Sequence, residues 1–298
     1  MKTLLLISVI ATLPLATSVS AQSKPKKEKP KPQLSGFETE TYKKIGDIEL
    51  KMRIYKPDGW KASDKRPVLV FFFGGGWRNG SPDQFHHHCL HLSRLGMVAM
   101  AAEYRIQSKH KSTPFDSTKD ARSAIRWARA NAARWGADPQ RIGAGGGSAG
   151  GHLAAATATT GSVIGEKGED ASVRATPDAL VLFNPALNLR FEKVHQMWGD
   201  DVYAKIAAIS PHQNVSKDLP PTIIFHGMAD TTVSYNSAEA FVAKAKEAGA
   251  KQVELKGYQD KGHGFFNHGR NRNADYESTV KEMTKFLVDL GWVKAQRV

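Results

Sequence analysis

The chain is poor in cysteine: Cys89 is the only one among 298 residues. A single cysteine excludes an intramolecular disulfide, so we expect an apolar core to supply the stability and Cys89 to be a small buried group. Long apolar runs are scarce too. The longest, Leu4 to Leu15, is interrupted at Thr12 and Pro14 and falls short of the roughly 20 apolar residues that a membrane-spanning helix needs.

The first 21 residues have the pattern of an export signal. Lys2 precedes the apolar run, and Val19-Ser20-Ala21 supplies small residues that suit a signal-peptidase site. We expect removal of residues 1–21, no integral membrane segment in the remainder, and a secreted or periplasmic protein. Residues 22–35 follow as a Lys/Pro-rich linker, whose five lysines and three prolines predict an extended, disordered spacer.

Acidic residues are outnumbered, because 29 Asp and Glu face 42 Lys and Arg, for a net charge of +13. This balance suits a polyanionic partner, but lysines dispersed over a surface produce it as well, and we favour dispersed lysine. The sequence contains no nucleic-acid-binding motif, so we expect no nucleic acid partner.

Residues 36–298 show neither an internal repeat nor a second linker, which predicts one domain. Residues 48–54 alternate apolar and charged side chains after a turn, as a half-buried strand does. Further strands are predicted at 68–73, 97–102, 141–145, 179–183, 222–225 and 253–258, and helices at 84–95, 117–135, 152–158, 237–248 and 276–290. Strands that alternate with helices indicate an α/β fold with a doubly wound, mostly parallel sheet and an N-terminal antiparallel hairpin.

Ser148 lies in Gly146-Gly147-Ser148-Ala149-Gly150, between a predicted strand and a predicted helix. A strand, a tight turn and a helix in this order form a nucleophile elbow, which holds a serine in a strained conformation at a strand end. The flanking glycines are needed because side chains there would meet the neighbouring strand and helix. We therefore predict that Ser148 is a catalytic nucleophile.

A serine nucleophile needs a base, and the base needs a carboxylate to orient it. Asp230 follows one predicted strand and His263 follows the next, so both lie at strand ends, as Ser148 does. We predict that the three form a catalytic triad. Asp260 is a rival acid, but it lies only three residues from His263 on the same loop and would be too constrained to support the imidazole.

Three successive glycines end another central strand, in Phe73-Gly74-Gly75-Gly76-Trp77. We predict that an amide of Gly75 or Gly76 faces a developing oxyanion beside the amide of Ala149, which opens a helix. Trp77 and Trp198 are candidates for stacking against substrate. Trp77 is preferred as a substrate-binding residue because it adjoins the glycine loop.

Six motifs therefore occur in a fixed order. They are Phe73-Gly74-Gly75-Gly76-Trp77, Glu103-Tyr104-Arg105, Asp138-Pro139-Gln140-Arg141-Ile142, Gly146 to Leu153, His226-Gly227-Met228-Ala229-Asp230 and Gly262 to Asn267. This series resembles the α/β-hydrolase serine esterases close to the hormone-sensitive-lipase and feruloyl or acetylxylan esterase groups, over roughly residues 45–290. The resemblance implies an α/β-hydrolase fold and a serine carboxylesterase, often one that removes acetyl or feruloyl groups from plant polysaccharides, with no metal or cofactor.

Two residues depart from the pattern of these esterases. Phe73 stands where many relatives have histidine, so packing must hold the glycine loop, and Ser234 replaces a common proline, which would loosen the loop that carries Asp230. Residues 186–219 occupy the usual place of a lid, and because the segment is short we expect an open cleft. His86, His87 and His88 would point in different directions on a helix, so we expect no metal site there.

Two other readings stay open at this level. One is a prolyl-oligopeptidase-like peptidase, although such enzymes usually carry a large gating domain that 298 residues do not accommodate. The other is a non-catalytic pseudo-hydrolase that binds a polyanion, although pseudo-hydrolases typically lose a triad residue and none is missing here. The acyl group, the alcohol, and the oligomeric state are not determined by the sequence.

Overall fold

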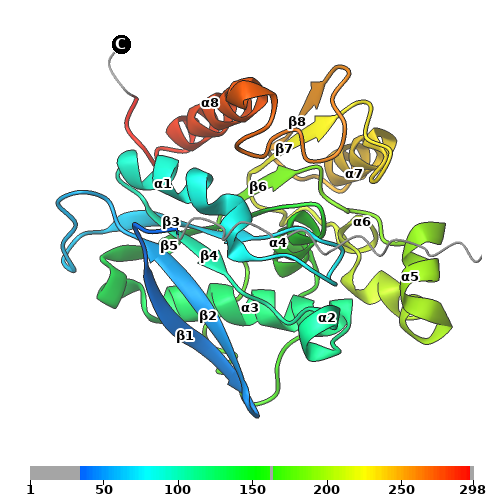
Figure 1. Cartoon of the computed structure of the whole chain (residues 1–298), viewed down its shortest axis with the longest axis horizontal. Coiled ribbons are helices and arrows are strands. Elements are labelled where there is room, and N and C mark those ends of the chain that lie inside the picture. Colours follow the sequence, from blue (N-terminus) through cyan, green and yellow to red (C-terminus); the bar gives the residue numbers. More distant parts are fainter. Residues whose placement is uncertain (1–33, 162–163, 296–298) are drawn as a thin grey trace, which may run out of the picture. The chain divides into compact units, whose positions relative to one another are not determined.

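The computed structural model describes residues 34–161 and 164–295. The predicted signal at 1–21 and most of the linker predicted at 22–35 lie outside the described residues, so both stay predictions. What is described is built around one eight-stranded sheet, which Figure 1 shows flanked by helices.

The strands of the sheet lie in the order β1-β2-β4-β3-β5-β6-β7-β8. Their bounds are β1 Glu38–Ile45, β2 Ile48–Tyr55, β3 Arg66–Phe72, β4 Val98–Ala102, β5 Ala137–Gly147, β6 Leu180–Phe183, β7 Thr222–Gly227 and β8 Val253–Tyr258. The first two form an antiparallel hairpin, β2 also pairs with β4 antiparallel, and all other pairs are parallel. The predicted α/β-hydrolase arrangement with its N-terminal hairpin is confirmed. The parallel strands bring their carboxyl ends to one edge.

Helices cover both faces of the sheet (Figure 1). The helices are α1 His86–Arg94, α2 Gln107–His110, α3 Pro114–Ala130, α4 Ala149–Thr159, α5 Glu192–Tyr203, α6 Pro211–Asn214, α7 Tyr235–Glu247 and α8 Ala274–Asp289, with short 3-10 turns η1 Pro82–Phe85, η2 Ala132–Trp135, η3 Ile206–Ile209 and η4 Asn271–Asn273. Helices α3, α4 and α7 pack in the core layer on one face, whereas α1 and α8 pack on the other. None of the described helices is long and apolar enough to cross a membrane.

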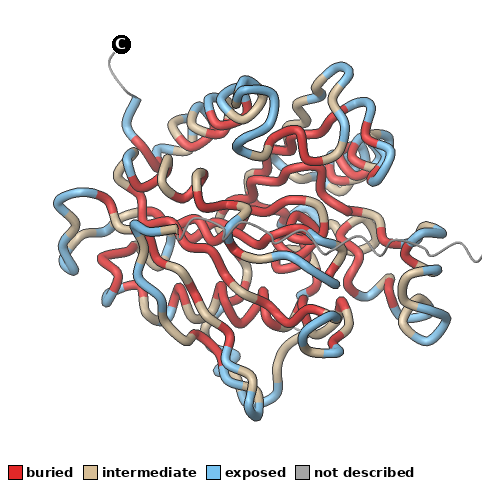
Figure 2. Tube along the Cα trace, in the orientation of Figure 1, coloured by how far each residue is buried: buried red, intermediate tan, exposed pale blue. Residues whose placement is uncertain are grey.

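Strand β3 shows how one strand serves both core layers. Val68, Val70 and Phe72 belong to the layer under α3 and α4, and Leu69 and Phe71 belong to the layer under α1 and α8. Alternate residues of a strand face opposite sides, so a strand covered on both faces must be apolar throughout. Figure 2 shows the buried residues following these central strands.

The sequence analysis gave no bounds for β1, α2, α5 and α6. β1 is largely polar, and α2 and α6 have four residues each, too few to show a period. The lid segment predicted at 186–219 contains α5, whose backbone breaks at Gly199 with a φ of 72°. Helix α3 begins at Pro114, three residues before the predicted start at residue 117, because Thr113 and Asp116 form a capping box around Pro114.

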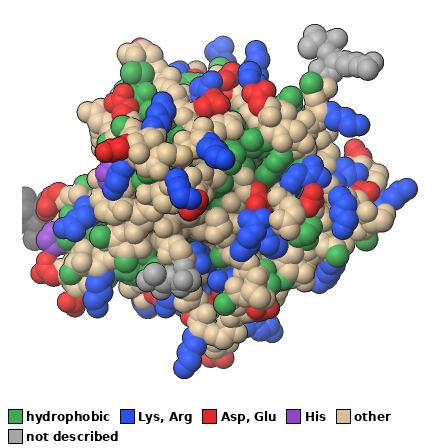
Figure 3. Space-filling view, turned by 180° about the vertical axis from the view of Figure 1, so that it is seen from behind, with side chains coloured by type: hydrophobic (Ala, Val, Ile, Leu, Met, Phe, Trp, Pro, Cys, Tyr) green, Lys and Arg blue, Asp and Glu red, His purple; other side chains and the backbone are tan. Residues whose placement is uncertain are grey.

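Charged side chains on one face of the molecule are spread rather than gathered (Figure 3). On the face shown in Figure 3, Lys and Arg are scattered with acidic groups among them. Below the surface, Lys43 and Arg105 both bind the buried Asp120 carboxylate, at 2.7 and 2.8 Å, and both also bind Glu166 at 2.8 Å. This cluster ties β1 to α3 and gives Asp120 a structural role. Cys89 is fully buried, as predicted.

Candidate active site

Ser148 occupies a strained turn between β5 and α4. Its φ of 55° and ψ of −119° lie outside the regions that a serine prefers. Gly146 and Gly150 make this turn sterically feasible, because a Cβ on Gly146 would overlap the Gly150 carbonyl and one on Gly150 would overlap the Phe72 carbonyl. The glycines thus let β3, β5 and α4 approach closely enough to hold Ser148 at the strand ends, which is the geometry of a nucleophile elbow.

Asp230 and His263 are joined by a hydrogen bond. The Nδ1 atom of His263 lies 2.7 Å from Oδ2 of Asp230, although 33 residues separate them in sequence. The rival acid Asp260 is exposed at a positive φ of 57°, and its carboxylate bonds to Gln259. Asp230 is therefore the carboxylate that orients the imidazole.

The Asp230 carboxylate is buried and held from several sides. Its Oδ2 also accepts a hydrogen bond from Asn184 Nδ2 at 2.5 Å, and its Oδ1 accepts from the amides of Thr232 at 2.8 Å and Val233 at 3.0 Å. Burial alone would raise the pKa of this carboxyl, but the hydrogen bonds outweigh burial and hold the pKa well below its usual range. These bonds fix the loop after β7, so Ser234 in place of proline does not leave Asp230 unsupported.

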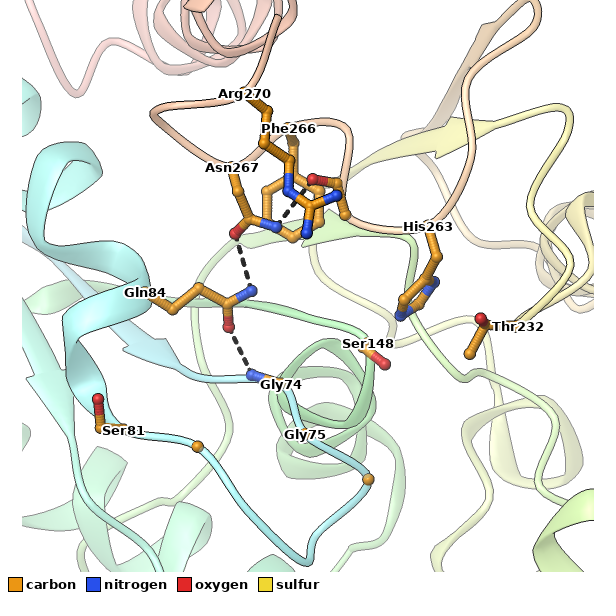
Figure 4. A pocket seen from close by; sticks show the side chains of 13 residues that line it. Gly74, Gly75, Ser81, Gln84, Ser148, Thr232, His263, Phe266, Asn267 and Arg270 are labelled. Atoms are coloured by element: carbon orange, nitrogen blue, oxygen red, sulfur yellow. Dashed lines mark hydrogen bonds between the residues drawn. The ribbon is translucent and has the colours of Figure 1, made fainter. Parts of the chain in front are cut away.

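Because the Asp230 carboxylate is ionised, it has only acceptor atoms, and His263 Nδ1 must carry the proton between them. The neutral imidazole then presents an unprotonated Nε2. Figure 4 shows His263 and Ser148 at the same cavity, whose lining includes both side chains. Within the described chain, Ser148 Oγ makes no hydrogen bond, so its hydroxyl is free to meet a substrate.

Three backbone amides near Ser148 are also free. The N–H groups of Gly75, Gly76 and Ala149 make no hydrogen bond to any residue in the described ranges. Gly75 has a φ of 120°, and a Cβ there would overlap the Asn79 carbonyl, so the loop requires glycine at this position. Unsatisfied amides beside a serine at a helix N-terminus are suited to receive a negatively charged oxygen.

A side-chain relay links the glycine loop to the loop of His263. The Gly74 amide donates to Gln84 Oε1 at 2.6 Å, Gln84 Nε2 donates to Asn267 Oδ1 at 2.9 Å, and Asn267 Nδ2 donates to the Gly264 carbonyl at 2.8 Å. Figure 4 shows this chain of contacts along one wall of the cavity. Gln84 therefore sets the spacing between the free amides and the imidazole.

Aromatic packing supports the glycine loop, as expected from the presence of Phe73 where many relatives have histidine. The Phe73 ring stacks on Tyr104 with centroids 4.1 Å apart, and the Tyr104 hydroxyl donates to the Phe73 carbonyl at 2.7 Å. Trp77 is 3% exposed, and its Nε1 donates to His152 Nδ1 at 3.1 Å. Trp77 lines a recess beside Ser148, but so buried a ring offers no open stacking face for a sugar. Trp198 does not line the cavities at Ser148.

Two cavities of unequal size meet at Ser148. The wide cavity has a volume of about 540 Å³ and is lined mainly by polar groups and glycines, among them Gln84, His263, Asn267 and Arg270. The small recess has a volume of about 50 Å³ and is walled by Trp77, Phe191, Val194, Met197 and Val233 among others. Figure 4 looks into the wide cavity. Among the described residues, no three His, Cys, Asp or Glu side chains are grouped to hold a metal ion.

The sequence reasoning missed several contributors to this geometry. Asn184 directly follows β6, so its strand-end position was a usable signal. The sequence around Gln84 contains no motif that would indicate its role in the site. Asn267 ends the motif Gly262 to Asn267 and Arg270 lies three residues after it, but neither position indicates which groups the two side chains contact.

Comparison with known proteins gives a consistent result. Residues 52–245 match the model of the BD-FAE family. The chain is 28% identical over 236 residues to esterase LipC of Mycobacterium tuberculosis, which covers 70% of this chain and 56% of that protein. The chain spans about half the length of the mycobacterial relatives it matches.

Solved structures match more completely. Esterase 2 of Thermogutta terrifontis with propionate bound has a TM-score of 0.84 and 43% identity, over 89% of this chain and 98% of that one. The same enzyme phosphoramylated by tabun has a TM-score of 0.83 and 43% identity, over the same shares. The resemblance to α/β-hydrolase serine esterases that the motifs carried is thereby confirmed.

Proposed function

The chain belongs to the BD-FAE family, and from this premise we propose that it is a serine carboxylesterase in which Ser148, His263 and Asp230 act as the catalytic triad. The observation that carries the proposal is the convergence of the Asp230–His263 hydrogen bond, the free hydroxyl of Ser148 and the free amides of Gly75, Gly76 and Ala149 where the wide cavity meets the recess. The relatives named as esterases support the same reaction class.

In the first step, Ser148 Oγ attacks the ester carbonyl carbon while His263 Nε2 takes the hydroxyl proton. The carbonyl oxygen becomes an oxyanion, which the amide of Ala149 and those of Gly75 or Gly76 stabilise. Asp230 stabilises the imidazolium through Nδ1 and remains ionised, because its pKa is held low.

The tetrahedral intermediate then collapses. Its carbon–oxygen bond to the alcohol breaks, His263 gives its proton to the departing alkoxide, and an acyl group remains on Ser148. Water attacks this acyl-enzyme, giving a proton to His263, and the second collapse returns that proton to Ser148 Oγ and releases the carboxylic acid. The cycle consumes one ester and one water and needs no further reactant.

The leaving oxygen must lie beside His263, so the alcohol part of the ester extends into the wide cavity that His263 lines. The acyl group then faces the recess. The recess, at about 50 Å³, is far smaller than the wide cavity of about 540 Å³, so we infer an acetyl group rather than a feruloyl group. The wide cavity, which has the hydrogen-bonding side chains of Gln84, Asn267 and Arg270 in its wall, suits a carbohydrate alcohol, and acetylated polysaccharide is our proposed substrate class.

The test of the triad is Ser148→Ala with p-nitrophenyl acetate as substrate. We expect turnover to fall to background while the thermal unfolding midpoint stays near that of the wild type. A fluorophosphonate probe should label the wild type and not Ser148→Ala. As a control, Ser172→Ala removes an exposed hydroxyl that bonds to Asp170 and should label normally. Normal turnover by Ser148→Ala would show that the nucleophile lies elsewhere.

The test of the acyl group compares acetylated xylan with methyl ferulate, and p-nitrophenyl acetate with the octanoate. Acetyl esters should be preferred in both pairs. Faster release of ferulate would mean that the recess does not receive the acyl group, and peptide substrates that outcompete every ester would favour a peptidase.

We also infer that the protein is exported, because residues 1–21 have the three parts of a cleavable signal. N-terminal sequencing of protein recovered outside the cytoplasm should begin at Gln22. An intact Met1 in that fraction would contradict this inference.

A further inference from the structure

We propose that the Arg270 guanidinium binds a carboxylate carried by the alcohol part of the ester. This inference rests on the proposed function, since it concerns the leaving group of the same reaction. It adds a substrate class, namely esters of hydroxylated acids, which include acetylated acidic sugars and small hydroxy acids.

The position of Arg270 is the first argument. It lies seven residues after His263 and lines the wide cavity with His263 and Ser148. Figure 4 shows its side chain turned toward that cavity beside Phe266 and Asn267. Since His263 must protonate the leaving oxygen, the alcohol part occupies the space that Arg270 faces.

The lack of a partner is the second argument. Arg270 makes no hydrogen bond or ion pair through its guanidinium to any residue in the ranges 34–161 and 164–295. Arginines elsewhere in the fold are committed: Arg105 binds Asp120, Arg126 binds Glu169 and Arg129 binds Asp178. The five donors of Arg270 are thus available, and their fork matches a carboxylate in a bidentate contact.

The charge of the cleft is the third argument. The described residues that line the wide cavity include no aspartate or glutamate, and neither do those of the recess, where Lys193 adds a second cation. A cleft with cations and no lining carboxylate attracts an anionic substrate, and low-dielectric walls strengthen that attraction. A neutral alcohol would leave the guanidinium with water alone.

Hydrogen bonds from neighbouring residues hold the backbone at Arg270 in place. Asn267, three residues before Arg270, is anchored to Gln84, and the Arg270 amide donates to the Asn267 carbonyl at 3.4 Å. The backbone that carries Arg270 is therefore linked to the glycine loop. A substrate carboxylate bound there would be held at a defined distance from the ester carbon.

The experiment uses two acetate esters that differ in one group. 4-Acetoxybenzoate carries a carboxylate on the leaving phenol, and 4-acetoxybenzamide carries a neutral amide of similar shape. The measured quantity is the ratio of kcat/KM for the acid ester to that for the amide ester, in wild type, Arg270→Gln, Arg270→Lys and Arg272→Gln. Arg272 is the matched control, because it is exposed on the same segment but does not line the cavity.

We expect Arg270→Gln to lower the ratio about tenfold, allowing for the partial solvent exposure of the pair. Arg270→Lys should recover part of the loss, and Arg272→Gln should leave the ratio unchanged. The wild-type ratio should fall as salt rises from low to 0.5 M. A second pair, acetylated oligogalacturonate and acetylated xylo-oligosaccharide, distinguishes acidic sugars from small hydroxy acids as the source of the carboxylate.

An unchanged ratio in Arg270→Gln would overturn the inference, and so would an equal fall in Arg272→Gln, which would indicate the general field of a basic surface. The proposed function fails differently. If Ser148→Ala retains turnover of both esters, the nucleophile is wrongly assigned, and if the wild type hydrolyses neither ester, the esterase assignment is wrong. In both cases the fault lies with the proposed function rather than with Arg270.

Discussion

The Gln84 carboxamide donates to Asn267 Oδ1 at 2.9 Å, across 183 residues of sequence. The Oε1 atom of the same carboxamide accepts a hydrogen bond from the Gly74 amide at 2.6 Å. One neutral side chain thus fixes the loop that offers the free amides against the loop that carries the imidazole. This contact makes Gln84 a positioning residue, because it has no direct role in the bonds that form or break.

Gln84→Ala should therefore lower kcat for p-nitrophenyl acetate by about tenfold or more, with a smaller change in KM, since a displaced oxyanion donor affects the transition state more than ground-state binding. Gln84→Glu keeps the acceptor for Gly74 and loses the donor to Asn267, so it should lie between Ala and wild type. Gln107→Ala, which removes an exposed bond to Arg78, is the control. A loss confined to KM, or none, would refute the positioning role.

Asp230→Asn should reduce kcat by about 10³-fold or more, because an amide can donate to His263 Nδ1 and favour the wrong tautomer.

Asp230→Asn also tests the lowered pKa of the Asp230 carboxyl. The folded carboxyl has a pKa below that of the unfolded chain, so its contribution to stability is present above about pH 4 and is lost as the pH falls further. Urea midpoints at pH 5 and pH 3 should differ less in Asp230→Asn than in wild type. An equal or steeper loss would contradict this account.

His88 is fully buried on α1 with neither ring nitrogen bonded to a described residue, and burial lowers its pKa to about 3. Below an unfolded-state pKa of about 6.5, the unfolded chain gains a proton that the folded chain does not, so His88 destabilises the fold as the pH falls. His88→Leu should add about 1 kcal/mol at pH 7 by removing unsatisfied polar atoms, and about 2 kcal/mol more at pH 5.

Urea unfolding of His88→Leu at both pH values measures these gains. His195→Gln, which replaces a half-exposed histidine on α5, is the control for the loss of an imidazole. A destabilised His88→Leu at pH 5 would mean that the imidazole has a partner in solution that its packing among aromatic rings does not provide.

Phe191 belongs to the lining of the recess and also to that of a neighbouring cavity of about 300 Å³. Removing its ring should join the two spaces, so Phe191→Ala is expected to accept longer acyl chains. The ratio of kcat/KM for p-nitrophenyl octanoate to that for the acetate should rise about tenfold, because burying about two further CH₂ groups at about 0.8 kcal/mol each contributes about 1.6 kcal/mol. Tyr203→Ala, on the same segment but outside both linings, is the control. A ratio that does not move would indicate that the acyl group does not face Phe191.

The sequence predicted most of what positions the site, for reasons that particular residues make clear. Central strands such as Val68 to Phe72 are apolar throughout because both faces are covered, and the glycines around Ser148 are required by close backbone contacts. β1 escaped detection as a defined range because its residues are mostly polar and one side chain, Lys43, is buried by ion pairing rather than by apolar packing.

Long-range side-chain contacts could not be predicted in the same way. The choice of Gln84 to hold Gly74, or of Asn184 to hold Asp230, depends on which loops the finished sheet brings together. Local pattern carries no such information. The burial of Trp77 was missed for a related reason. Its partner His152 comes from α4, and that imidazole also contacts the Ile209 carbonyl in the segment after α5.

Ser148, Asp230 and His263 follow β5, β7 and β8, so a polypeptide cut between α4 and β6 would separate the hydroxyl from the other two groups. Neither fragment could hydrolyse an ester alone. The two fragments would still pair through β5 and β6 and pack in the apolar layers on both faces of the sheet. Co-expressed fragments that recombine through this strand pair would regain turnover, which makes the chain a candidate for a split reporter.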